Sequence, residues 1–232
     1  MSNSHVSKNR KKVAVLLNGC GHRDGSEIHE AVLTLLAIEE EGVDWEAVAL
    51  NLDQAAVLNH LDGTVDRAGS SRNMLKESAR IARGKIKNLV DVNPADYVAL
   101  IIPGGNGTAA NLCNFATAGK DMVVNKDVSQ LLRSFHESGR PIGAICISPM
   151  LIASVFGKSG VKITLGEIKG GAPEAASHMG AKVQLCGARE CVVDHELKIV
   201  TTPAYMLDAS VADIAQGIRQ LTKDVIKLAE SK

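Results

Sequence analysis

The chain has 232 residues, of which 45% are hydrophobic, and its 26 basic residues balance its 26 acidic residues. A chain of this length can bury a sizeable core but is short for two full domains, so we expect one globular domain. The zero net charge and the aromatic content of 3% argue against nucleic acid as a partner. Such a chain offers neither a basic field for phosphates nor a stacking surface for bases.

The first residues are polar and basic, and we expect 1–11 to form a flexible tail ahead of a single domain over 12–232. They lack the apolar stretch of a secretion signal, and no segment reaches the roughly 18 apolar residues needed to cross a bilayer. A basic start with serines can also be a weak organelle transit peptide, but this one is short and has no amphipathic stripe. We therefore expect a cytoplasmic protein that does not bind membranes.

The cysteines form an odd set without a Cys-x-x-Cys pair, which argues against a disulfide framework and against a structural zinc site. We expect them to be reduced thiols. They are Cys20, Cys113, Cys146, Cys186 and Cys191.

The first half of the chain alternates apolar strands with amphipathic helices. Residues 13–17 are a continuous apolar run, typical of a parallel strand that is buried on both faces. Ser26 as a cap and Gly42 as a stop predict a helix over 26–41. Further along, the pattern predicts a strand over 45–50, a helix over 71–83 and a strand over 97–102.

The second half continues the same alternation. We expect a helix over 128–137, a strand over 141–145, a helix over 147–156, short strands near 162–165, 182–185, 190–193 and 199–201, and a long amphipathic helix over 207–228. Strands that alternate with helices indicate an α/β fold whose mostly parallel sheet is covered on both faces. Ligands of such sheets bind outside the carboxyl ends of the strands.

Cys146 follows a predicted strand directly and precedes a helix. Amide groups and the helix dipole at such a place lower the pKa of a thiol. The turn is like the elbow that presents a nucleophile, although Gly143-Ala-Ile-Cys-Ile147 does not match Gly-x-Ser-x-Gly. A cysteine after a strand is otherwise a small buried residue. The loop at 103–107 favours the nucleophile, because the N–H groups of Gly104 and Gly105 also follow a strand and suit an oxyanion.

A carboxyl group near the start of the first helix is the second candidate. Glu30 lies one turn into that helix, and Glu27 is a rival on the same turn. Either could reach the sulfur, and either could be an ordinary solvated side chain.

Several motifs together carry a resemblance to a known family. Pro103-Gly-Gly-Asn-Gly107 followed by Ala144-Ile-Cys-Ile-Ser-Pro149 is similar to the PfpI-like branch of the class I glutamine amidotransferase-like superfamily. Gly19-Cys-Gly21, Asp24-Gly-Ser-Glu-Ile-His-Glu30 and Thr201-Thr-Pro-Ala-Tyr-Met206 closely resemble its ElbB subfamily. The resemblance covers roughly residues 12–230. It implies a three-layer flavodoxin-like sandwich and a homodimer.

The resemblance assigns roles in the site by position. Cys146 would be the nucleophile, Glu30 would hydrogen-bond to it, and the amides of Gly105 and Ile147 would form the oxyanion hole. Glu30 is preferred over Glu27 because its interval to Gly42 is similar to the helix-to-Gly interval of the superfamily. We expect the substrate pocket to be lined by Gly104, Asn106, Glu27, Cys20 and Tyr205.

ElbB-type proteins are described as glyoxalases that need neither glutathione nor metal. The resemblance thus implies a lyase of the hydro-lyase type, without a cofactor, that converts glyoxal, and by extension methylglyoxal, to the 2-hydroxy acid. A thiolate of Cys146 would add to the aldehyde, and Glu30 would move a proton between the two carbons. Water would then release the thioester.

Other activities of the superfamily are disfavoured. Peptidase-like members carry a His directly after the nucleophile, where this chain has Ile147. Glutaminase subunits carry a late His-x-Glu pair, whereas His195-Glu196 lacks the intervening residue. His136 or His178 could complete the site, but a solvated helix His is the ordinary explanation.

A metal site is also disfavoured, because the spacing of His22, Asp24 and His29 matches no zinc signature. Two functions of other classes stay open. One is a redox or stress sensor in which Cys146 is oxidised, and the other is an accessory metabolite-binding protein linked to isoprenoid metabolism.

Overall fold

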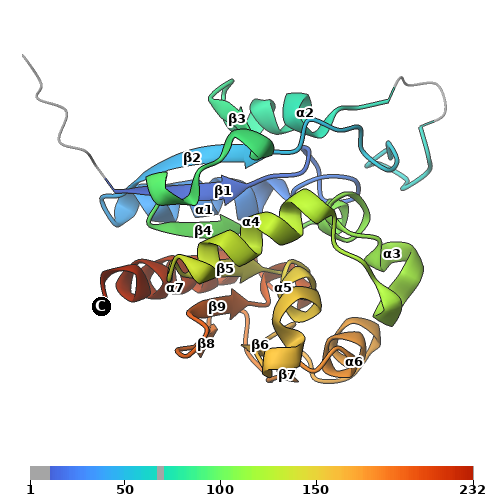
Figure 1. Cartoon of the computed structure of the whole chain (residues 1–232). Coiled ribbons are helices and arrows are strands. Elements are labelled where there is room, and N and C mark those ends of the chain that lie inside the picture. Colours follow the sequence, from blue (N-terminus) through green and yellow to red (C-terminus); the bar gives the residue numbers. More distant parts are fainter. Residues whose placement is uncertain (1–10, 67–70, 232) are drawn as a thin grey trace, which may run out of the picture.

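Figure 1 shows the computed structural model of the chain, which describes residues 11–66 and 71–231. The predicted tail lies outside these residues except for residue 11. The single-domain boundary at 12–232 stays a prediction.

A seven-stranded sheet forms the centre of the fold. Its strands lie in the order β3-β2-β1-β4-β5-β9-β8, and each neighbouring pair is parallel except β8 and β9. Two further strands, β6 and β7, pair with each other in a small parallel sheet. The strands are β1 (Lys12–Leu16), β2 (Asp44–Ala49), β3 (Ile86–Asn88), β4 (Ala99–Ile102), β5 (Ile142–Ile145), β6 (Lys162–Ile163), β7 (Lys182–Val183), β8 (Val192–Asp194) and β9 (Ile199–Thr202).

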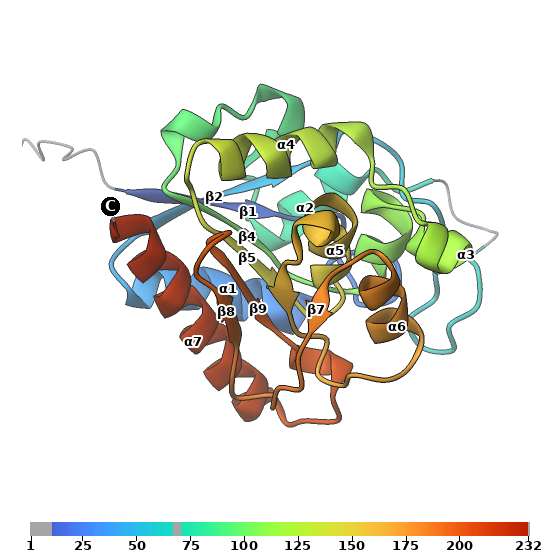
Figure 2. The ribbon, with the colours of Figure 1, turned by 60° about the horizontal axis from the view of Figure 1, so that its bottom comes forward.

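Helices cover both faces of the large sheet. α1 and α7 pack together on one face, and α4 and α5 lie on the other (Figures 1 and 2). The α-helices are α1 (Ile28–Glu40), α2 (Met74–Ile81), α3 (Phe115–Ala118), α4 (Lys126–Glu137), α5 (Pro149–Phe156), α6 (Gly171–His178) and α7 (Val211–Glu230). Short turns are the 3₁₀ helices η1 (Leu89–Asp91), η2 (Pro94–Asp96), η4 (Gly119–Asp121), η5 (Gly157–Ser159) and η6 (Ala204–Met206), and the π-helix η3 (Thr108–Leu112). The predicted layered α/β sandwich with a mostly parallel sheet is confirmed.

The strand order reverses between β1 and β4, since the chain first builds outward to β3 and then continues through β5 on the other side. The loops that leave β1 and β4 therefore meet at the carboxyl end of the sheet, where ligands of such folds bind. Main-chain hydrogen bonds join them: the N–H of Glu27 donates to the carbonyl of Gly104 at 2.9 Å, and the N–H of Asn106 donates to that of His22 at 2.7 Å. Two loops far apart in the chain thus form one rim.

Some predicted boundaries are wrong, for local reasons. Ser26 does not cap the first helix, because its hydroxyl accepts a hydrogen bond from the N–H of Asn18, and Glu27 caps α1 instead. Helix α2 begins only at Met74, with Asn73 as its cap. Both cases show that several polar residues before a helix compete for the capping position.

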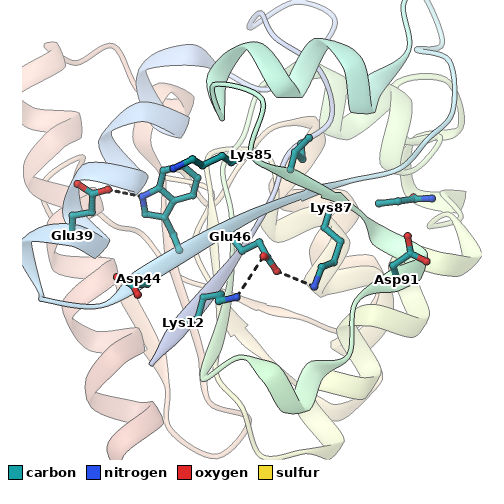
Figure 3. Close-up of a pocket in the computed structure, with 10 residues that line it drawn as sticks. Lys12, Glu39, Asp44, Glu46, Lys85, Lys87 and Asp91 are labelled. Atoms are coloured by element: carbon teal, nitrogen blue, oxygen red, sulfur yellow. Dashed lines mark hydrogen bonds and ion pairs between the residues drawn. The ribbon is translucent and has the colours of Figure 1, made fainter. Parts of the chain in front are cut away.

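A cavity of about 760 Å³ opens at the amino half of β2, beside β3 (Figure 3). Within it, Glu46 pairs with two lysines, Lys12 at 3.4 Å and Lys87 at 3.1 Å. The indole of Trp45 donates to Glu39 at 2.8 Å. None of the predicted site residues lines this cavity, and it lies at the opposite end of the strands from Cys146.

Candidate active site

Cys146 stands at a strained turn between β5 and α5. Its φ of 63° is in the left-handed region, which is uncommon for a residue other than glycine and unfavourable by about 1–3 kcal/mol. The N–H of Cys146 donates to the carbonyl of Thr202 at 3.0 Å, which ties the turn to β9. The residue is only 8% exposed. The surrounding strands therefore hold one thiol in a conformation that an isolated turn would not keep.

Ser148 connects this turn to the loop after β4. Its buried hydroxyl donates to the carbonyl of Pro103 at 2.9 Å. Behind it, Thr108 lies 3.4 Å from the hydroxyl of Ser148 and accepts a hydrogen bond from Asn18 at 3.1 Å. This chain of buried polar groups fixes the position of the sulfur relative to the glycine loop, and sequence reasoning did not identify it.

The glycine loop places amide groups against the sulfur. The N–H groups of Gly105 and Ile147 both hydrogen-bond to Cys146. Gly105 has a φ of 103°, and a Cβ there would lie 2.6 Å from the nitrogen of Glu27. Only glycine can therefore bring this amide so close to the neighbouring loop. The two predicted oxyanion-hole amides are brought together beside Cys146.

Glu30 is the carboxyl group that reaches the nucleophile. It is fully buried, its Oε2 accepts a hydrogen bond from the N–H of Gly104 at 2.8 Å, and its side chain also hydrogen-bonds to Cys146. Burial and the charge of Glu27 raise the pKa of Glu30 to about 8, against the opposing hydrogen bonds. At neutral pH the group is therefore mainly a neutral carboxylic acid.

The thiol does not have the lowered pKa that the sequence predicts. Burial and the negative charge of Glu30 raise the pKa of Cys146 well above its ordinary value, although the amides of Gly105 and Ile147 act in the opposite direction. Two acids in contact resist a double negative charge but accept a single one. The single charge rests first on Glu30, whose pKa is the lower of the two. We infer that the Glu30 carboxylate takes the proton of the thiol as the substrate binds, so that the reactive form is a thiolate beside a protonated Glu30, which can then donate a hydrogen bond to the sulfur.

The expected pocket residues fall into two groups. Gly104 lies between the nucleophile and the carboxyl group, since a Cβ on it would be 3.0 Å from the sulfur and 2.7 Å from Glu30 Oε2. Tyr205 donates its main-chain N–H to Glu30 Oε1 at 3.4 Å. Glu27 caps α1 and accepts the N–H of Glu30 at 2.7 Å. These three lie beside the site.

The remaining two expected pocket residues have other surroundings. Asn106 is exposed and contributes its main chain to the rim. Cys20 is partly buried, and the charges nearest to it include Glu77 and Arg80 of α2. The sequence did not indicate that Cys20 lies close to α2, because this proximity depends on how the loop after β1 folds.

The histidine that approaches the site is His29. Its Nδ1 lies 2.8 Å from the hydroxyl of Tyr205, whereas the sequence suggested His29 only as part of a metal cluster. His136 instead contacts the ring of Phe156, at 5.0 Å between centroids, and His178 is exposed on α6. Over residues 11–66 and 71–231, no group of three or more His, Cys, Asp or Glu side chains is arranged to hold a metal ion.

Comparisons with known proteins agree with this architecture. The model of the DJ-1/PfpI family matches residues 11–208. The chain is 41% identical to the "ES1 protein homolog, mitochondrial" of Rattus norvegicus, over 97% of this chain and 86% of the relative. It is also 41% identical to the "Glutamine amidotransferase-like class 1 domain-containing protein 3, mitochondrial" of Homo sapiens, over 96% of this chain and 85% of the relative.

A solved structure is similar along almost the whole chain. It is the "isoprenoid biosynthesis protein with amidotransferase-like domain" from Ehrlichia chaffeensis, with 33% identity and a TM-score of 0.86. The match covers 94% of this chain and 99% of the other. The flavodoxin-like, class I glutamine amidotransferase-like fold expected from the sequence is thereby confirmed.

One expectation is overturned by the same relatives. The rat and human proteins are both named as mitochondrial, which contradicts the predicted cytoplasmic location. A sorting signal is a separate segment that need not pack with the folded domain, so the patterns that predict the fold carry no information on location. In the part of the chain that the structure describes, no helix has the length and apolar character needed to span a bilayer.

Proposed function

Because this chain belongs to the DJ-1/PfpI family, we propose that it is a cysteine-dependent glyoxalase that acts without glutathione, metal or cofactor. Its substrates would be glyoxal and methylglyoxal. The observation that carries the proposal is the contact between the buried thiol of Cys146 and the buried carboxyl group of Glu30. The amides of Gly105 and Ile147, which hydrogen-bond to the sulfur, support the proposal. The same amides can stabilise the negative charge that develops on the substrate oxygen next to the sulfur.

The first steps use the pair directly. The thiolate of Cys146 attacks one aldehyde carbon of glyoxal, a C–S bond forms, and the carbonyl oxygen takes the proton of Glu30. The Glu30 carboxylate then removes the hydrogen from that carbon while the second carbonyl oxygen gains a proton, which gives an enediol. The raised pKa of Glu30, about 8, suits a group that must both give and take a proton near neutral pH.

The later steps release the product. Glu30 returns its proton to the second carbon, and the first hydroxyl group loses its proton to solvent, so that a glycolyl thioester remains on Cys146. Water hydrolyses the C–S bond, the sulfur and Glu30 regain their starting forms, and one proton passes to solvent. The sum is glyoxal plus water to glycolate plus a proton, without an oxidant or a reductant.

The burial of Cys146 bears on the two other functions. A redox sensor needs an exposed thiolate with a low pKa, and this thiol is 8% exposed with a raised pKa. The observation therefore counts against sensing, whereas in catalysis the adjacent carboxylate of Glu30 can take the proton of the thiol. The name of the Ehrlichia chaffeensis protein mentions isoprenoid biosynthesis, and an accessory metabolite-binding role there predicts binding without turnover.

The test is product formation by purified protein from glyoxal and from methylglyoxal, without glutathione and with a metal chelator present. Chromatography should detect glycolate and lactate from the wild type and from Cys113→Ser, a control at another buried thiol. Cys146→Ser and Glu30→Gln should yield neither product. A wild type that yields no product would refute the glyoxalase, and oxidation of Cys146 by peroxide would then favour the sensor.

A homodimer belongs to the same proposal. Ile28, Val32 and Leu36 are spaced four residues apart on α1 and are 43%, 48% and 42% exposed, so they form an apolar stripe that a second copy of the chain can cover by twofold symmetry. Light scattering should give twice the mass of the chain, and Val32→Lys should give a monomer. A monomeric wild type would refute the dimer.

A further inference from the structure

A second hydrogen-bonded pair lies next to the catalytic pair. Nδ1 of His29 is 2.8 Å from the hydroxyl oxygen of Tyr205, and the two ring centroids are 5.8 Å apart. His29 is exposed on the first turn of α1, whereas Tyr205 in η6 is partly buried. The pair therefore has one end in solvent and the other toward the interior.

The main chain fixes Tyr205 at the site. Its N–H donates to Oε1 of Glu30 at 3.4 Å, while the side chain of the same Glu30 hydrogen-bonds to Cys146. The preceding residue, Ala204, has a φ of 43°. Such a conformation persists only where the surroundings impose it, and it clusters at functional sites. One carboxyl group thus connects Tyr205 to the nucleophile.

The carboxyl groups of Glu27 and Glu30 also act on the phenol itself. Burial, followed by the charges of Glu27 and Glu30, raises the pKa of Tyr205. The hydroxyl therefore keeps its proton at neutral pH. A phenol that is held in place and protonated is a hydrogen-bond donor and a general acid.

The glyoxalase reaction leaves a task for such a donor. When Glu30 removes the hydrogen from the first carbon, the oxygen of the second carbonyl group must gain a proton, and Glu30 cannot supply it in the same step. The amides of Gly105 and Ile147 are committed to the first oxygen, beside the sulfur.

We propose that Tyr205 donates this proton to the second carbonyl oxygen of the dicarbonyl, and that His29 restores it from solvent. The inference rests on the proposed function and adds a second pair of residues to it. The O–H bond of Tyr205 breaks as the new O–H bond of the enediol forms. The phenolate then takes the proton from Nδ1 of His29, and the exposed ring regains a proton at Nδ1 from solvent before the next turnover. Solvent in turn receives the proton that the first hydroxyl group later releases. Tyr205 is the catalytic residue of this pair, and His29 is a relay.

The proposal explains why a dicarbonyl is needed. A simple aldehyde can form a hemithioacetal with Cys146, but it has no second oxygen for Tyr205 and cannot proceed to the enediol. Addition to the sulfur and proton transfer at the second oxygen are therefore separable steps.

The experiment separates them with Tyr205→Phe, His29→Ala and the control His178→Ala, an exposed helix histidine on α6. Two readouts are needed: kcat and KM for glyoxal, and the rate at which iodoacetamide alkylates Cys146. Tyr205→Phe should lower kcat by about 10²-fold with little change in KM, as expected for loss of a general acid. Alkylation should keep the wild-type rate.

His29→Ala should lower kcat by about 10-fold, a part of the general-acid effect, and added imidazole should restore it because the site of His29 is open to solvent. Imidazole should not rescue Tyr205→Phe, and His178→Ala should behave as the wild type. Unchanged kcat in Tyr205→Phe, or a fall in kcat matched by an equal fall in alkylation, would overturn the inference while the glyoxalase stands. A wild type without turnover would refute both, and the wild-type assay alone reveals that case.

Discussion

The main-chain N–H of Gly104 donates to Oε2 of Glu30 at 2.8 Å, and the space above Gly104 is bounded by that oxygen and the sulfur of Cys146. A methyl group there would lie 2.7 Å from the oxygen and 3.0 Å from the sulfur. Glycine is therefore required if carboxyl group and thiol are to meet.

Gly104→Ala should separate the pair, reducing glyoxal turnover by at least about 10²-fold, because loss of acid–base catalysis has that magnitude. The matched control is Gly171→Ala, where a Cβ meets no atom within 4 Å and φ is not positive. The measurement is kcat/KM for both variants, together with melting followed by circular dichroism. Normal turnover in Gly104→Ala would contradict the contact.

Glu30 should make the protein less stable as the pH rises. Its pKa is about 8 in the folded chain against 4.5 for the ordinary group, so the folded state binds the proton more tightly. The stabilisation is complete below about pH 4.5 and is lost as the pH rises through 8. Glu30→Gln lacks this titration, so its free energy of unfolding should exceed that of the wild type by more at pH 9 than at pH 5, by a few kcal/mol.

Urea unfolding at several pH values checks this, with the fluorescence of Trp45, the single tryptophan of the chain, as the probe. Glu137→Gln on the exposed end of α4 is the control and should follow the wild-type pH dependence. Parallel curves for wild type and Glu30→Gln would show that the carboxyl group is not perturbed.

The strain at Cys146 should be measurable by comparing two replacements at that position. Glycine accepts a φ of 63° without a penalty, so Cys146→Gly should be more stable than Cys146→Ala by about 1 kcal/mol. At buried Cys113, where φ is −154°, the order should reverse, since glycine loses more chain entropy on folding. The same order at both positions would mean that the turn is not strained.

Ser148→Ala removes the hydrogen bond to the carbonyl of Pro103 and leaves that buried group without its partner, at a cost of about 1–3 kcal/mol. It should also slow the alkylation of Cys146, because the turn would no longer be tied to the glycine loop. Ser177→Ala is the control, as its hydroxyl makes a similar bond to the carbonyl of Pro173 on α6 at 2.9 Å. If both variants alkylate at equal rates, Ser148 acts on stability alone.

Much of the site was predictable because it is local. Cys146 directly follows a buried apolar strand and Gly105 lies three residues beyond the end of another, and parallel topology brings the ends of such strands together. The place of Glu30 depended on the family resemblance, because helix periodicity alone does not distinguish it from Glu27.

Other features depend on packing between distant segments. His29 precedes Glu30 by one position, so it points about a quarter turn away around the helix, and its partner Tyr205 is brought near by β9. The raised pKa of Cys146 follows from burial, which a sequence does not display. The hydroxyl of Ser148 hydrogen-bonds to the main-chain carbonyl of Pro103, and no sequence motif identifies such a contact.

Two hydrogen bonds tie the site to the last part of the chain. The N–H of Cys146 donates to the carbonyl of Thr202, and the N–H of Tyr205 donates to Glu30, so the site cannot be complete before these residues have been added. During synthesis, a chain that has emerged only as far as β5 carries the thiol but neither the neighbouring strand nor the group that orients the acid. Until β9 has joined the sheet, the cysteine therefore lacks both the strained turn and the oriented carboxyl group of the finished site.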